Sequence, residues 1–154
     1  MKLGFASLII MSVVVLAMAQ GGRRPIVRYN NPATLSTPTG YTHLVEVTGG
    51  KTIYISGQIA LDKAGNVVGA GDFKAQTRQV FENLKAALTA AGATFDNVVK
   101  TNTYVTDLTE IQALREIRAG YYGRNAPAST LVRVVGLARP EFMIEIEGIA
   151  VVPE

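Results

Sequence analysis

The stretch PASTLVRVVGLARPEFMIEIEGIAVV, residues 127–152, decides how the rest of the chain is organised. Two runs rich in β-branched residues, 129–137 and 142–152, flank the segment Arg-Pro-Glu at 139–141. Strand-forming runs on either side of a short polar break are typical of a β-hairpin. The C-terminal part of the chain is therefore predicted to end in a hairpin.

Two carboxylates, Glu145 and Glu147, share one face of the second run, because side chains alternate between the two faces of a strand. Ile144 and Ile146 share the other face. One interpretation makes the carboxylate face a solvated outer surface, since charged residues are rarely buried without partners. The other interpretation places the two carboxylates in a functional cleft.

Two helices and a strand are predicted before this stretch. The first helix covers 73–91, with Asp72 as its N-cap and apolar residues at helical spacing. The strand begins at Val99 and ends near Asp107, and residues on its two faces alternate through Thr106. Thr109 can cap the second helix, which ends near Gly123.

The N-terminal half begins with an irregular arm over residues 20–40, which are dense in Gly, Pro, Asn, Ser and Thr. Two strands, 44–48 and 52–58, are predicted to form a hairpin through the turn Gly-Gly at 49–50. A further turn at 62–66 is predicted to precede a short strand at Val67 and Val68. Residues 41–154 are then expected to form one domain.

The fold class that follows is α+β, with a mixed β-sheet and two helices packed on one face. A chain of 154 residues is large enough for one such core. Two helices that connect strands of a single sheet cover only one of its faces. The other face requires a partner, so we expect a homo-oligomer.

Residues 1–19 have the features of an export signal. Lys2 precedes an apolar run, and Ala17-Met18-Ala19 provides the small-x-small pattern of a cleavage site before Gln20. The alternative is a membrane anchor, for which the run is near the lower length limit. We expect cleavage after Ala19, no stable membrane insertion afterwards, and a periplasmic or secreted product.

The composition argues against several classes of site. His43 is the single histidine and there is no cysteine, so zinc and haem sites are not expected. The chain contains neither a phosphate-binding loop nor a G-x-S-x-G nucleophile motif. Its net charge of +3 predicts no nucleic-acid partner.

Several motifs resemble the RidA/YjgF family of reactive-intermediate (enamine/imine) deaminases. They are Tyr41, Ser-Gly-Gln at 56–58, Val-Thr-Asp-Leu at 105–108 and Glu-Ile-Glu-Gly-Ile-Ala at 145–150, in collinear order over about residues 38–152. The resemblance implies a chorismate-mutase-like fold and a homotrimer whose sheets form a central β-barrel. It also implies small-molecule clefts between subunits, in which water hydrolyses imino or enamino acids to a keto acid and ammonia without any cofactor.

The resemblance also implies the roles of individual residues. Glu145 would position or activate the water, Tyr41 would lie on the cleft wall, and Ser56 and Gly57 would provide polar and backbone contacts. Members with deaminase activity carry an arginine in a Pro-Ala-Arg-Ser-like motif, where its planar fork holds the substrate carboxylate. Here Ser129 occupies the arginine position.

The departure from the family pattern puts standard 2-imino-acid deamination in doubt. Leu131 stands where many members have cysteine, and Arg115 where some have asparagine. Arg115, Arg133 or His43 could compensate for the lost arginine. For Arg133 the simpler interpretation is a cross-strand partner of a carboxylate in the hairpin.

Three functions remain open from the sequence. The first is an exported hydrolase of an imine, an enamine or a related small nitrogen compound. The second is a ligand-binding homotrimer without turnover. The third, an endoribonuclease or translation inhibitor as some family members have been described, is disfavoured by the weak charge and by export.

Overall fold

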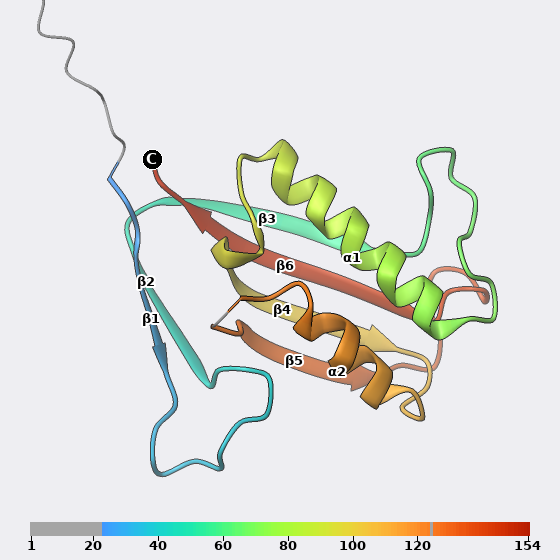
Figure 1. Cartoon of the computed structure of the whole chain (residues 1–154), viewed down its shortest axis with the longest axis horizontal. Coiled ribbons are helices and arrows are strands. Elements are labelled where there is room, and N and C mark those ends of the chain that lie inside the picture. Colours follow the sequence, from blue (N-terminus) through green and yellow to red (C-terminus); the bar gives the residue numbers. More distant parts are fainter. Residues whose placement is uncertain (1–22, 124) are drawn as a thin grey trace, which may run out of the picture.

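The computed structural model describes residues 23–123 and 125–154, so the predicted export signal lies outside the described residues. The chain forms a mixed sheet with helices on one side and a separate two-stranded sheet near its N-terminal end (Figure 1). The elements, in order, are β1 (Ile26–Asn30), β2 (Leu44–Thr48), β3 (Lys51–Gln58), α1 (Phe73–Ala90), η1 (Phe95–Asn97), β4 (Val98–Val105), α2 (Ile111–Ala119), β5 (Ala128–Arg133) and β6 (Ile144–Val152).

The main sheet has the strand order β3-β6-β4-β5, so the predicted C-terminal hairpin is wrong. β5 and β6 do not pair, because β4 lies between them. The crossover through α2 brings β5 back parallel to β4 and occupies one edge of that strand. β6 takes the other edge of β4, antiparallel, after a connection over residues 134–143 that is far longer than a tight turn.

The predicted hairpin between the second and third strands is also wrong. β2 pairs with β1, whereas β3 pairs with β6. Gly49 and Gly50 both have positive φ, and a Cβ at Gly50 would lie 2.8 Å from the Val152 carbonyl oxygen. The two glycines therefore form a tight corner that carries the chain from one sheet into the other. Because β1 lies within residues 20–40, that segment is not wholly irregular as predicted.

Helix α1 confirms the first helix prediction. The Asp72 carboxylate accepts a hydrogen bond from the Ala75 N–H at 3.0 Å, as an N-cap does. In α2, however, Thr109 is not the cap. Its hydroxyl donates to the Asp107 carboxylate at 2.7 Å, and the helix begins after Glu110 and ends at Ala119, earlier than predicted. The predicted strand at Val67 is reduced to an isolated bridge with Leu61.

The core lies between the main sheet and the two helices, which cover the same face (Figure 1). Ile144 and Ile146 of β6 are 0 % and 1 % exposed, whereas Glu145 and Glu147 point to the opposite, uncovered face and are half-buried. The predicted α+β class and the alternation along β6 are confirmed. Over the described residues, none of the helices combines the length and the hydropathy that a membrane span requires.

Candidate functional site

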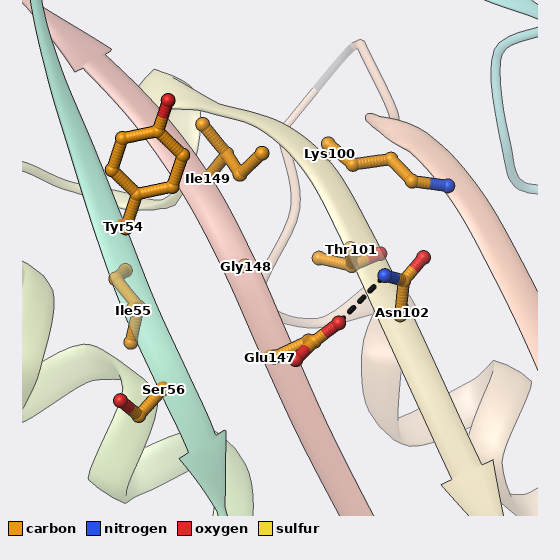
Figure 2. A pocket seen from close by; sticks show the side chains of 9 residues that line it. All are labelled: Tyr54, Ile55, Ser56, Lys100, Thr101, Asn102, Glu147, Gly148 and Ile149. Atoms are coloured by element: carbon orange, nitrogen blue, oxygen red, sulfur yellow. Dashed lines mark hydrogen bonds between the residues drawn. The ribbon is translucent and has the colours of Figure 1, made fainter.

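Two hollows lie on opposite faces of the main sheet. The open-face pocket, on the side away from the helices, has a volume of about 280 Å³ (Figure 2). Its lining consists of residues from β3, β4 and β6: Tyr54, Ile55, Ser56, Lys100, Thr101, Asn102, Glu147, Gly148 and Ile149. The helix-side pocket, of about 320 Å³, is lined by Thr39, Tyr41, Leu108, Ile111, Leu114, Arg115, Arg118, Ser129 and Leu131.

Glu147 is held in place by its neighbours on β4. Asn102, directly opposite in the strand register, donates its amide hydrogen to Glu147 Oε1 at 2.7 Å (Figure 2). The Tyr104 hydroxyl donates to the same oxygen at 3.0 Å. That hydrogen bond, with burial and the charges of Glu147 and Glu145, raises the pKa of Tyr104. Glu147 is therefore a fixed acceptor rather than a mobile base.

Glu145 lies beside the backbone of Gly57. The pairing of β3 with β6 shifts its register between Ile55 and Gln58, which places the intervening residues in a bulge. A Cβ at Gly57 would overlap the Glu145 carboxylate, so only glycine leaves room for it. Three predicted site residues, Glu145, Gly57 and the exposed Ser56, thus come together on the open face.

Four other predicted site residues meet on the helix side: Tyr41, Arg115, Ser129 and Leu131 line the same pocket. A parallel bridge between Thr42 and Ala128 brings the two distant segments together, and the Thr42 hydroxyl donates to the Ala126 carbonyl at 2.6 Å. The Ser129 hydroxyl accepts from Thr101 at 3.3 Å. The predicted residues therefore form two half-sites that face away from each other within one chain.

Arg118 lines the helix-side pocket, although the sequence reasoning missed it. It follows Arg115 by one helical turn, and this i, i+3 spacing was the available signal. Its Nη2 atom would lie 2.6 Å from a Cβ at Gly40, so that glycine leaves room for the guanidinium. Burial lowers the pKa of Arg118, the neighbouring Tyr122 opposes this shift, and the charge of Arg115 adds to it.

His43 and Arg133 line neither hollow. His43 Nε2 lies 2.8 Å from the Ser36 carbonyl oxygen, and its ring meets Tyr41 edge-on at 5.3 Å between centroids. Arg133 Nε donates to the Thr106 carbonyl at 3.1 Å. Arg133 therefore braces the loop after β4, which corrects its predicted pairing with a hairpin carboxylate. Over residues 23–123 and 125–154, no three His, Asp or Glu side chains gather as a metal site would require.

Comparisons with known proteins match most of the chain. A family profile described as Endoribonuclease L-PSP matches residues 32–152. A RutC family protein of Pyrococcus horikoshii is 42% identical over 68% of this chain and 82% of its own. Among solved structures, the Rid family protein YyfB of Yersinia pestis is 40% identical, with a TM-score of 0.77 over 82% of this chain and 98% of its own. RidA of an Antarctic Psychrobacter species is 36% identical, with a TM-score of 0.62 over 76% of this chain and 92% of its own.

Proposed function

The chain belongs to the RidA/YjgF family, and from this membership we propose that it hydrolyses a small imine, enamine or related nitrogen compound in a cleft between subunits. The observation that carries the proposal is the position of Glu145. Its carboxylate is half-buried on the uncovered sheet face, beside the Gly57 backbone and on the same face of β6 as Glu147, which lines the open-face pocket. A carboxylate in such a place can take a proton from water.

The reaction needs only water and a proton carrier. Water attacks the carbon of the C=N bond while Glu145 accepts one of its protons and returns it to the nitrogen, which gives a carbinolamine. Glu145 then transfers the proton of the new hydroxyl group to the nitrogen, and the C–N bond breaks as the carbonyl forms. A carbonyl compound and ammonia leave, and Glu145 returns to its starting charge.

We propose a homotrimer because the two half-sites face opposite sides of one chain. A neighbouring copy that covers the open face can bring its helix-side pocket toward Glu145, which completes a cleft from two chains. Tyr54 supports this arrangement, since 80% of its surface is exposed on the open face and a large exposed aromatic is typical of an interface.

A test couples an L-amino-acid oxidase to the purified protein and follows the disappearance of the imine. We expect Glu145→Gln to lower the rate about 100-fold or more, as loss of a general base does. Glu46→Gln, on exposed β2, is the matched control and should leave the rate unchanged. Equal rates for wild type and Glu145→Gln would contradict the role of Glu145.

The second candidate function is a ligand-binding trimer without turnover, which Ser129 favours because the family arginine is absent. The same assay with Ser129→Arg separates the two functions. If wild type does not hydrolyse the imine and Ser129→Arg does, the fold can support hydrolysis and the natural substrate is a different compound. Silence in both, with carboxylate binding retained, would favour binding alone.

The location of the protein is a further part of the proposal. Lys2, the apolar run after it and the Ala17-Met18-Ala19 pattern support export to a periplasm or to the medium, with cleavage after Ala19. Mass spectrometry of the secreted or periplasmic protein should find Gln20 as the first residue. An intact N-terminus in the cytosolic fraction would contradict export.

A further inference from the structure

Two arginines on α2 border two adjoining hollows. The first is the helix-side pocket. The second, of about 360 Å³, is lined by Thr39, Gly40, Arg115, Arg118, Ala119, Tyr122, Gly123 and Ala126. Thr39, Arg115 and Arg118 belong to both linings, so the two hollows meet at the guanidinium groups.

Neither guanidinium has an anionic partner among residues 23–123 and 125–154. The single ion pair there, within 4.0 Å, joins Lys85 to Glu82. Among the described residues, no hydrogen bond joins the side chain of Arg115 or Arg118 to another residue, and no fully buried side-chain nitrogen or oxygen lacks a partner. The N–H groups of half-buried Arg118 must therefore reach the open space of the hollows.

Arg118 is half-buried and Arg115, one helical turn before it, is exposed, and their like charges repel each other. Burial first, and then the charge of Arg115, disfavours the charged form of Arg118, which is the direction of its pKa shift. An anion between the two guanidinium groups would offset both the burial of the Arg118 charge and its repulsion by Arg115. The remainder of the helix-side pocket is largely apolar, with Leu108, Ile111 and Leu131 in its lining.

We propose that Arg115 and Arg118 bind the carboxylate of a small ligand whose apolar part lies in the helix-side pocket. Planar guanidinium groups suit a carboxylate, since each can give two parallel hydrogen bonds. The apolar lining and the volume of about 320 Å³ fit a short aliphatic or aromatic chain. The inference rests on the proposed cleft, and it places the cationic clamp on α2 instead of at position 129 of β5.

The test compares binding of butyrate and benzoate with that of their neutral amides and of inorganic phosphate, by calorimetry and thermal shift. We expect both carboxylates to bind and to raise the melting temperature, and both amides to fail. Arg115→Met and Arg118→Met should each weaken carboxylate binding about tenfold to a hundredfold, as loss of a charge-assisted contact does. Arg28→Met, on exposed β1, is the matched control and should bind as wild type does.

The ligand-free stability of Arg118→Met shows whether a loss of binding reflects misfolding. Its melting temperature without anion should equal or exceed that of wild type, because the substitution removes a half-buried charge next to another of the same sign. Equal binding of butyrate and butyramide, or full carboxylate binding by both variants, would overturn the inference. Phosphate binding tighter than carboxylate binding would overturn the choice of ligand.

The outcomes separate this inference from the proposed hydrolysis. Carboxylate binding that depends on both arginines, in a protein without imine turnover, would leave the clamp standing and refute the hydrolase. Turnover that is unchanged in Arg115→Met and Arg118→Met, with no carboxylate binding, would refute the clamp and leave the hydrolase.

Discussion

Gly57 and Glu145 show how one missing side chain positions another. A Cβ at Gly57 would overlap the carboxylate, so Gly57→Ala must displace Glu145. We expect this variant to lose imine hydrolysis about tenfold to a hundredfold, because small misplacements of a reacting group are costly. Gly136→Ala, where no atom lies within 4 Å of the added Cβ, is the control for the coupled oxidase assay. A Gly57→Ala enzyme as fast as wild type would show that the carboxylate can move without effect.

At the scale of residues, the period of a strand was enough to place Glu145 and Glu147 together. It could not bring Tyr41 to Ser129, because their meeting depends on a bridge between Thr42 and Ala128. That contact joins segments far apart in the chain and leaves no local pattern. Arg118 was within reach of sequence reasoning through its spacing from Arg115, but its exposure to a pocket required the tertiary structure.

At the scale of elements, Gln76 of α1 ties the helix to the loop before β6. Its side chain donates to the Glu141 carbonyl at 2.7 Å and accepts from the Met143 N–H at 2.9 Å, and it is 0 % exposed. Gln76→Leu removes both hydrogen bonds, so we expect it to lower the free energy of unfolding by about 1–3 kcal/mol. Urea denaturation checks this value. Gln112→Leu on the exposed side of α2 should change it little, and an equal loss in both variants would contradict the role of Gln76.

The segment after α2 packs an aromatic cluster against the core. Tyr121 stacks on Phe81 at 4.6 Å between centroids, and Tyr122 meets Phe95 edge-on at 5.4 Å. Burial raises the pKa of Tyr122 to about 12, an effect that the charge of Arg118 and a side-chain hydrogen bond with Thr101 oppose.

This shift makes stability fall in alkali. Between about pH 10 and 12 the unfolded chain has lost the Tyr122 proton and the folded chain retains it, so stability falls as the pH rises. In that window the free energy of unfolding should fall by about 1.4 kcal/mol per pH unit. Below it, Tyr122 should add nothing to the slope. Tyr122→Phe should flatten the curve of unfolding free energy against pH. An identical alkaline slope in wild type and variant would show that Tyr122 ionises freely in the folded state.

Both hairpin predictions failed for one physical reason. A run of β-branched residues predicts a strand but not the strand with which it pairs. The partner depends on which edge of a neighbouring strand is still free. The crossover through α2 gives one edge of β4 to β5, which leaves the other to β6. The helices and β4 were predictable because their periodicity and the Asp72 cap are local.

For the whole molecule, the proposed trimer predicts a solution mass three times that of one chain, measured by analytical ultracentrifugation. Tyr54→Lys should reduce that mass to a single chain, since it places a flexible charge on the open face. Lys63→Glu, in the exposed turn after β3, is the control and should leave the mass unchanged. A wild-type protein with the mass of one chain would remove the basis for a shared cleft.

Because the two half-sites of one chain face opposite ways, two inactive variants of this protein should complement each other in mixed oligomers. In the proposed trimer, Glu145→Gln and Arg118→Met damage different halves of the cleft, so each variant alone should contain only defective clefts. When the two are unfolded, mixed in equal amounts and refolded together, about a quarter of all clefts draw both sound halves from neighbouring copies. Two inactive proteins would then rescue each other, which no monomeric enzyme with a self-contained site can do.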